Sequence, residues 1–364
     1  MKVKDIASWL DTAVPLSFQE SWDNSGLQIG NPETEISSAL LTLDVTEEVV
    51  DEAISENCQM IISHHPLIFS GIKKITGSSP TDRTIIKALR NDIAIYSSHT
   101  NLDVFRNGVS RKMAEKLGLR NVTPLSPLRE RLLKLVTFVP GSHIDGVREA
   151  VFGAGAGLIG NYDYCGFTLT GTGSFRAGPD SSPFVGEKGK IHHEKEIRFE
   201  TILFSHLKES VIKALKSSHP YEEPAFDIYP LANNTTEEGL GCKGEFAEPV
   251  EEKALLETVS SVFGPKSIRY SGLTGRPVIL TALCGGSGSS LLNDAIRTGA
   301  GAFITGDVRY HTFMEACGRI LLIDAGHFET EKFATEILYD LIIKKFPKFA
   351  LRFSNKNSNP INYL

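Results

Sequence analysis

Two adjacent histidines, His64 and His65, lie where a short apolar run ends. The run Met60–Ile62 has the composition of a buried strand, and Pro66 prevents a regular continuation. Two imidazoles therefore lie together at the carboxyl end of a strand, where open α/β sheets bind their ligands. Imidazole binds transition metals and also transfers protons near neutral pH. A lone histidine pair is more often a surface or helix-capping pair, so its meaning depends on the rest of the chain.

Two further groups of ligand-type side chains have the same context. His327 and Glu331 follow the apolar run 319–323 and are four residues apart, so a helix beginning there would place both on one face. Such a pair is half of a metal site, although an isolated pair is more often exposed at a helix start. The third group, His99–Asp103, follows the apolar run 93–96. Three groups at three strand ends favour one shared site.

An internal repeat relates these groups to one another. Residues 51–63 align with residues 293–305, and both segments stand between strand-like runs with a helix-like stretch to follow. Each half of the chain is expected to form strand, helix, strand, helix, strand, which predicts a mostly parallel sheet with polar residues at one edge. Two such halves facing each other across a cleft would bring the three groups together.

Five motifs occur in an order that resembles one known family. They are Trp22-Asp23-Asn24-Ser25-Gly26-Leu27, Ser63-His64-His65-Pro66, His99-Thr100-Asn101-Leu102-Asp103, Thr305-Gly306-Asp307-Val308-Arg309-Tyr310-His311 and Gly326-His327-Phe328-Glu329-Thr330-Glu331. On these motifs the chain is identified as a member of the GTP cyclohydrolase 1 type 2 homologue family, also called NGG-interacting-factor-three-like. The resemblance implies an α/β fold of two similar lobes with a dinuclear metal cleft between them. The metal ligands that it implies, transferred by position, are His64, His65, Asp103, His327 and Glu331.

This implied ligand set indicates two divalent ions rather than one. Five protein ligands exceed the four of a closed zinc site, and a carboxylate can bridge two ions because it has two oxygens. Asp103 and Glu331 are the expected bridges. A mixed nitrogen and oxygen shell suits zinc, with iron or manganese as alternatives, and disfavours magnesium and calcium. Paired ions activate water, so the expected chemistry is hydrolysis at carbon or phosphorus.

The family name suggests GTP as the substrate, with attack of water on guanine C8 and release of formate. Another phosphorylated metabolite is the wider class. Opening a purine ring needs proton transfer, for which His99 and His311 are the catalytic candidates; for both, a hydrogen bond that holds a ligand is an equal alternative. The alternative function is a metal-binding regulatory or scaffold protein whose inserted domain senses a small molecule.

Two other features have structural interpretations. Asp44 ends the first strand and is expected to cap a helix that begins at Thr46, with a contact to a metal ligand as the weaker alternative. The glycine-rich run 283–290 joins a strand to a helix, as phosphate-binding loops do. It lacks the P-loop lysine and the GxGxxG spacing, so tight packing at the cleft is the preferred interpretation.

Residues 132–231 lie between the halves and do not belong to the repeat. Their length and their order of strand-like and helix-like segments predict an inserted α+β domain. This insert is similar to the trimeric signal-transduction and cation-tolerance proteins, which implies a ferredoxin-like fold. The expected domains are 1–131, the first lobe; 132–231, the insert; and 232–364, the second lobe. The resemblance also implies a homohexamer of two stacked trimers.

Composition and charge restrict the compartment and the kinds of partner expected for this protein. The 364 residues are 41% hydrophobic and 23% charged, near ordinary globular values, and no apolar run is long enough to span a bilayer. An amino-terminal segment without a signal-type apolar core and five cysteines without a CxxC pair fit a reducing cytoplasm. The formal net charge of −6 gives no sign of the basic surface that binds nucleic acid. A small molecule such as a nucleotide is the expected partner, rather than nucleic acid or a membrane.

Overall fold

The computed structural model describes residues 1–128, 132–160, 162–233, 237–356 and 359–364. The chain forms two compact units: the core unit, Met1–Pro127 with Thr236–Leu364, and the insert unit, Leu128–Thr235. Residue 131, the expected end of the first lobe, lies outside the described residues. In the described part of the chain, no helix has both the length and the apolar character needed to cross a membrane.

The helices of the core unit are α1 (Val3–Ala13), α2 (Glu47–Ser55), α3 (Pro80–Arg90), α4 (Thr100–Val104), α5 (Val109–Lys116), α8 (Glu252–Phe263), α9 (Leu292–Arg297), α10 (Tyr310–Ala316), α11 (His327–Glu331) and α12 (Ala334–Lys345). Its strands are β1 (Gly26–Ile29), β2 (Ser38–Thr42), β3 (Met60–Ser63), β4 (Ala94–Ser97), β5 (Arg120–Pro127), β10 (Gly239–Val250), β11 (Arg269–Tyr270), β12 (Val278–Leu283), β13 (Ala302–Thr305), β14 (Leu321–Asp324) and β15 (Ala350–Phe353).

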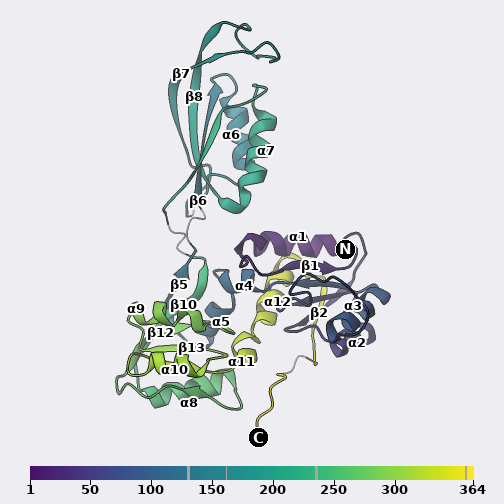
Figure 1. Cartoon of the computed structure of the whole chain (residues 1–364), viewed down its shortest axis with the longest axis vertical. Helices are drawn as coiled ribbons and strands as arrows, with labels where there is room; N and C mark the ends of the chain where they lie inside the picture. The colour runs from purple at the N-terminus through teal and green to yellow at the C-terminus, as the bar shows by residue number, and fades with distance from the viewer. Residues whose placement is uncertain (129–131, 161, 234–236, 357–358) are drawn as a thin grey trace. The chain divides into compact units, whose positions relative to one another are not determined.

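Two sheets with related strand orders form the core unit, which has a mixed α/β fold (Figure 1). The first sheet has the order β1-β4-β3-β2-β15, in which β1 alone runs antiparallel to its neighbour. The second has the order β11-β14-β13-β12-β10-β5, with β12, β13 and β14 parallel and β11 antiparallel to β14. The segment β1-β4-β3-β2 thus corresponds to β11-β14-β13-β12, strand for strand, as the sequence repeat requires. The lobes differ beyond this segment, where β15 is parallel to β2 and β10 is antiparallel to β12.

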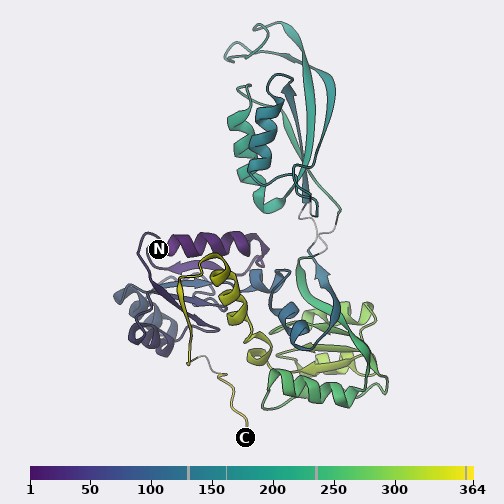
Figure 2. The same cartoon turned by 180° about the vertical axis from the view of Figure 1, so that it is seen from behind.

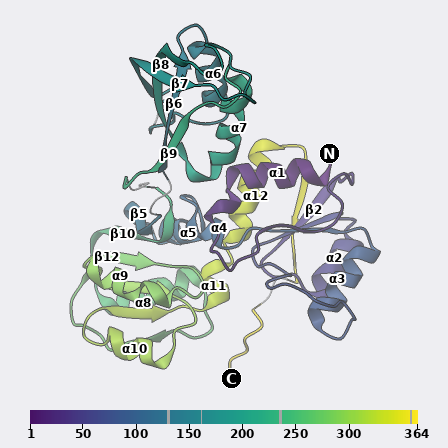
Figure 3. The same ribbon diagram turned by 45° about the horizontal axis from the view of Figure 1, so that its top comes forward.

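Both faces of each parallel sheet are covered, as its continuous apolar strands require. In β2, Leu40 packs with residues of α2 and α3, whereas Leu41 belongs to the largest apolar cluster of the unit. In β13, Phe303 packs with residues of α9 and α10, and Ile304 belongs to the cluster that includes residues of α8. Figure 3 shows α8, α9 and α10 next to the strands of this lobe. Because Leu41 and Ile304 belong to the same buried cluster, the two lobes share one apolar core. The shared core fixes the two sheets relative to each other.

Register places the polar strand ends of the first lobe at one edge. Thr42, Ser63 and Ser97 occupy equivalent positions at the carboxyl ends of β2, β3 and β4. The N–H of His64 donates to the Thr42 carbonyl at 3.2 Å, which continues the pairing one residue beyond β3. Side chains that follow these three positions therefore emerge together, as parallel topology predicts.

The insert unit consists of β6 (Leu132–Pro140), α6 (Ile144–Gly153), β7 (Gly166–Arg176), β8 (Ile191–Phe204), α7 (Lys208–Ser218) and β9 (Phe226–Pro230). Its four strands form an antiparallel sheet of order β7-β8-β6-β9. The two helices lie side by side on one face of this sheet (Figure 2). Their buried residues, such as Val151 and Leu215, pack against Leu135 and Phe199 of the strands. The unit therefore has an apolar core of its own.

Candidate metal centre

Three strand-to-helix turns of the core unit carry the ligand-type side chains. His64 and His65 follow β3, Asp103 lies on α4 directly after β4, and α11 after β14 carries the other two. His327 and Glu331 begin and end α11, so they lie one turn apart on the same face. The turns after β3 and β4 share one edge of the first sheet, and the turn after β14 of the second sheet meets them there.

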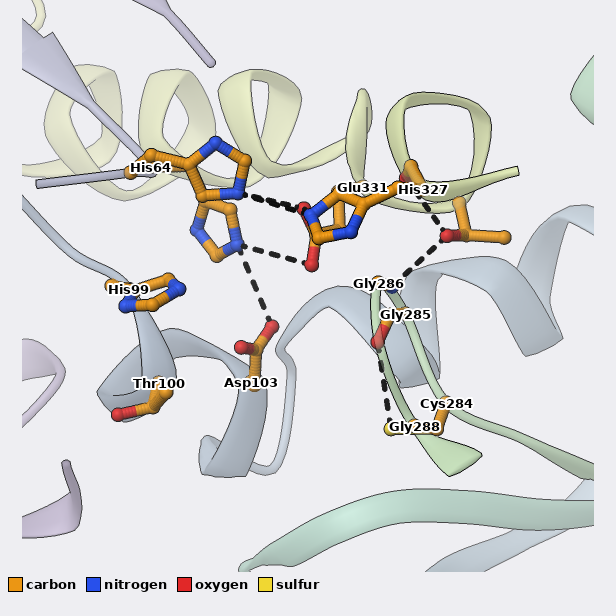
Figure 4. A network of polar contacts seen from close by, with 12 residues as sticks. His64, His99, Thr100, Asp103, Cys284, Gly285, Gly286, Gly288, His327 and Glu331 are labelled. Carbon is orange, nitrogen blue, oxygen red and sulfur yellow. Dashed lines mark hydrogen bonds and ion pairs between the residues drawn. The ribbon is translucent and has the colours of Figure 1, made fainter. Parts of the chain in front are cut away.

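Five side chains from both lobes converge at this place (Figure 4). Oε2 of Glu331 lies 2.9 Å from Nε2 of His65 and 2.8 Å from Nε2 of His327, and its Oε1 lies 3.9 Å from Nε2 of His64. Oδ1 of Asp103 lies 3.7 Å from the same His64 nitrogen. Ligand atoms of His64, His65 and Glu331 lie within 4.8 Å of one another and form a cluster that could hold a metal ion.

Two buried polar atoms of this cluster have no hydrogen-bond partner among the described residues. They are Nε2 of His64 and Oδ1 of Asp103. An unsatisfied buried nitrogen or carboxylate oxygen costs about 1–3 kcal/mol, and more when it is charged, so native structures seldom leave such atoms unpaired. An ion that accepts a lone pair from each atom would satisfy both. The residues present therefore fit a bound metal ion.

A hydrogen bond at the far side of each ring directs Nε2 of three histidines inward. Nδ1 of His64 donates to the Ser98 carbonyl at 2.8 Å, and Nδ1 of His65 donates to Asp44 Oδ1 at 2.8 Å. Nδ1 of His327 donates to Asp307 Oδ2 at 2.7 Å. Carbonyl and carboxylate oxygens only accept, so each Nδ1 carries the hydrogen and each Nε2 is left to bind an ion or a second proton.

The carboxylates set the protonation of these imidazoles. Burial would lower the pKa of His65, but the carboxylates of Asp44 and Glu331 outweigh it and raise this pKa to about 10. Burial would likewise lower the pKa of His327, but the carboxylates of Glu331 and Asp307 raise this pKa to about 9. Burial would raise the pKa of Glu331, but the hydrogen bond from His327 and the nearby imidazoles of His64 and His65 hold this pKa well below its usual range. Without a metal ion, protons on the imidazoles balance the buried carboxylate at neutral pH.

The glycine-rich run between β12 and α9 packs against Glu331. Gly286 has φ +58°, and a Cβ there would lie 1.9 Å from Glu331 Oε1. The Gly286 N–H donates to Thr330 Oγ1 at 3.0 Å rather than pointing at an open anion site. Close packing is thus the role that these contacts support, and the phosphate-loop alternative gains nothing from them.

The two histidines expected to transfer protons have different surroundings. The His99 ring centroid lies 5.4 Å from that of His64 and 5.5 Å from that of His65, and its Nδ1 donates to Asp23 Oδ1 at 2.7 Å. His311 is exposed on the first turn of α10, where its ring contacts Tyr310. No hydrogen bond, ion pair or ring contact joins His311 to the cluster in the described ranges. The structure therefore brings His99 to the site and does not bring His311 there.

Three aspartates that accept hydrogen bonds from histidines of the site were not predicted with this role as the main interpretation. Asp44 holds His65, whereas Thr46 performs the helix cap by accepting from the Val49 N–H. Asp307 occupies the repeat position of His65, and this correspondence was the signal that could have identified it. Asp23 shows no comparable signal, because a turn before Gly26 explains an aspartate equally well.

Comparisons with known proteins agree with this architecture. The family model Duf34/NIF3 (NGG1p interacting factor 3) matches residues 1–360. A Halalkalibacterium halodurans protein named GTP cyclohydrolase 1 type 2 homolog is 40% identical over 315 residues, which cover 86% of this chain and 85% of that protein. A Bacillus subtilis protein of the same name is 36% identical over 360 residues, covering 96% and 95%.

Two solved structures also resemble this chain over its whole length. A Bacillus cereus protein related to NIF3 is similar with a TM-score of 0.83 and 37% identity, covering 100% of this chain and 99% of that one. A Staphylococcus aureus protein is similar with a TM-score of 0.79 and 29% identity, at the same coverage.

Proposed function

This chain belongs to the Duf34/NIF3 family, and we propose that it is a dinuclear metal-dependent hydrolase that acts on a nucleotide such as GTP. The observation that carries the proposal is the pair of unsatisfied buried atoms, His64 Nε2 and Asp103 Oδ1, beside the His65, His327 and Glu331 side chains. Two unpartnered polar atoms that face each other in one buried cluster are better explained by a missing ligand than by a purely structural role. The name of the relatives, GTP cyclohydrolase 1 type 2 homolog, supplies the substrate class.

The five side chains divide into terminal and bridging ligands. Each of the three imidazoles offers one lone pair through Nε2, whereas the carboxylates of Asp103 and Glu331 offer two oxygens each and are the proposed bridges. Two zinc ions, or iron or manganese in their place, would supply a water of lowered pKa and stabilise developing negative charge. Asp44 and Asp307 keep the rings of His65 and His327 in the orientation that binding requires.

His99 is the proposed proton-transfer group. Asp23 accepts from its Nδ1, and the Asp23 side chain is fully buried, so the ring orientation is fixed. Burial would raise the pKa of Asp23, but the hydrogen bonds from His99 and Thr100 hold this pKa below its usual range, and the carboxylate stays charged. Because Asp23 accepts from Nδ1 of His99, Nε2 is the ring nitrogen left to accept a proton, as a general base requires.

An exposed aromatic pair beside His99 supports a ring-bearing substrate. Trp22 and Phe69 are 56% and 52% exposed, and their ring centroids lie 5.6 Å apart. Their centroids lie 6.1 and 6.2 Å from that of His99. Exposed aromatic faces stack on nucleobases, with about 1–3 kcal/mol for each base in single-stranded nucleic acids. A purine stacked there would lie next to the proposed proton-transfer group.

The insert unit has a proposed role in assembly. Its element order, β-α-β-β-α-β, and its antiparallel sheet support a ferredoxin-like fold. By resemblance, such inserts form trimers, and two stacked trimers give the proposed homohexamer. The second candidate function, a regulatory protein that senses a small molecule, is favoured by a cavity of about 870 Å³ within this unit.

Elemental analysis and formate release test the proposed function together. Protein loaded with zinc, iron or manganese should contain about two ions per chain and release formate from GTP. Glu331→Gln and His65→Ala should abolish formate release and lower the metal content, whereas Glu315→Gln, at an exposed position of α10, should change neither. Full metal loading without turnover of GTP or other phosphorylated metabolites would favour the regulatory alternative. A metal content near zero under all loading conditions would contradict both.

A further inference from the structure

The cavity of the insert unit has an apolar wall and an acidic character. Its volume of about 870 Å³ falls in the range of small-molecule sites. Four aromatic rings line it: Phe138, Phe175, Phe184 and Tyr221. Among its described lining residues, four are acidic, Asp180, Glu196, Glu222 and Glu223, and one, Arg198, is basic. The lining therefore offers ring faces and negative charge to an occupant.

Arg198 forms its ion pair with a residue outside this acidic set. Its Nε donates to Glu200 at 2.7 Å, and its guanidinium lies over the Phe138 ring, 5.8 Å from the centroid. No salt bridge joins any lysine, arginine or histidine to the four acidic lining residues within the described parts of the unit. The one basic group of the wall is thus paired with Glu200, a carboxylate outside the lining that also contacts Lys134.

Glu196 is the buried member of the acidic set, with 9% of its surface exposed. Its Oε1 accepts the Tyr221 hydroxyl at 2.9 Å. Its Oε2 lies over Gly173, where a Cβ would come within 2.1 Å of it. The absence of a side chain at Gly173 leaves room for this carboxylate between β8 and β7.

The imidazole of His219, which accepts a hydrogen bond from the Tyr221 backbone, is neutral. Nδ1 of His219 accepts the Tyr221 N–H at 3.1 Å, so the ring hydrogen must be on Nε2, which donates to the Phe138 carbonyl at 3.0 Å. Burial also lowers the pKa of His219. Among the described residues of the insert unit, no lysine, arginine or histidine forms a salt bridge with Glu196, although its side chain is nine-tenths buried.

We propose that this cavity binds a small organic ammonium ion, seated between the Glu196 carboxylate and the rings of Phe175 and Tyr221. An ammonium group provides the missing positive charge, and its alkyl groups contact the electron-rich ring faces. A metal ion fits less well, because the buried wall offers one carboxylate and aromatic carbon in place of a shell of oxygen or nitrogen ligands. An anion would face Glu196 directly. This site is separate from the metal centre and does not depend on the proposed hydrolysis.

Calorimetric titration of the full chain with choline and benzyltrimethylammonium tests this proposal. The neutral isostere 3,3-dimethylbutan-1-ol has the shape of choline without the charge. We expect choline to bind at least about tenfold more tightly than the isostere. Glu196→Gln should remove most of this preference, because glutamine can still accept the Tyr221 hydroxyl but carries no charge. Phe175→Leu should weaken choline about threefold and leave the isostere unchanged.

Glu209→Gln is the matched control, since Glu209 is exposed on α7 and does not line the cavity. It should bind choline as the unaltered chain does, and circular dichroism should show all variants folded. Equal binding of choline and its isostere would overturn the proposal, as would an undiminished preference in Glu196→Gln. Failure of both cations to bind at about 10 mM would also overturn it.

Discussion

Glu331 of the core unit and Glu196 of the insert unit are both buried carboxylates placed against a glycine, yet their surroundings differ. Glu331 has three imidazole nitrogens within 3.9 Å of its oxygens, each oriented by a hydrogen bond from its far side. Glu196 has one phenol hydroxyl and a wall of aromatic rings. The imidazoles of the chain itself are the partners of the Glu331 carboxylate. The proposed partner of the Glu196 carboxylate is a bound ammonium ion. Burial of a charge alone therefore does not identify a metal site; the donors around it do.

Zinc affinity should separate the two glutamates most strongly. Glu331→Gln removes the proposed bridging ligand and should weaken zinc binding more than about 100-fold, because even residues that only orient a ligand contribute about 10–100-fold. Glu196→Gln should leave zinc binding unchanged within about twofold. A competition titration with a chromophoric chelator measures both. Equal losses in the two variants would mean that the bound zinc is not held at the Glu331 cluster.

The second-largest difference between the two glutamates should be in the stability of the chelator-treated protein. Glu331→Gln leaves buried imidazolium groups without their carboxylate and should destabilise the core unit by about 3 kcal/mol at pH 7. In Glu196→Gln, the glutamine can still accept the Tyr221 hydroxyl, and no ion pair is broken. The free energy of unfolding of the insert unit should therefore change by less than about 1 kcal/mol.

Denaturant titrations can follow the two units separately. The two tryptophans, Trp9 and Trp22, lie in the core unit and report its unfolding by fluorescence, and circular dichroism adds the insert unit. A larger loss in Glu196→Gln than in Glu331→Gln would reverse the comparison and show that Glu196 has a partner of its own.

Asp307→Asn should weaken zinc binding about tenfold, less than Glu331→Gln does. The amide can present its NH₂ to His327 Nδ1 and so favour the wrong ring tautomer for binding through Nε2. The same competition titration measures the loss, and a variant of the cavity rim, Glu223→Gln, is the control. An affinity unchanged by Asp307→Asn would remove His327 from the proposed ligands.

Zinc binding should release protons, and this is the smallest of the expected effects. The pKa values of about 10 for His65 and about 9 for His327 leave both rings protonated at pH 7.5 without metal, so binding should release about two protons. The two raised pKa values stabilise the metal-free fold fully below about pH 6.5, and this contribution is lost as the pH rises through 9 to 10.

Calorimetry in buffers of different ionisation enthalpy counts the released protons. Zinc affinity should rise with pH up to about 10 and level off above it, since fewer protons then need to leave. Titration of Glu196→Gln should give the same proton count as the unaltered chain. A pH-independent affinity would show that zinc does not replace protons on these two rings.

The core of the fold and the meeting of the five side chains follow from readable features of the sequence. The repeat of residues 51–63 with 293–305 predicts two related sheets, and the shared order β1-β4-β3-β2 and β11-β14-β13-β12 confirms this expectation. Strand ends followed by polar turns then determine which side chains share an edge. The antiparallel additions β5 and β10 were not expected, because their sequences carry no trace of the repeat.

The roles of Asp23 and Glu196 could not be predicted from the sequence, because they depend on partners distant along the chain. Asp23 holds His99, 76 residues along the chain, and nothing local distinguishes it from a turn aspartate. Glu196 lies in the charged segment 190–198, and alternation along β8 turns it inward toward Tyr221. In both cases the decisive partner is set by packing between elements, which single-sequence patterns do not encode.

The pairing of β15 with β2 has a consequence for biosynthesis. Ala350 is in register with Ser38, so the sheet of the first lobe stays incomplete until β15 has left the ribosome, more than 300 residues after β2. At about 5–20 residues per second, the nascent β2 edge waits on the order of tens of seconds. The insert unit, which is continuous in sequence, can fold during that interval. Chaperones that shield strand edges would therefore act on the first lobe before its final strand arrives.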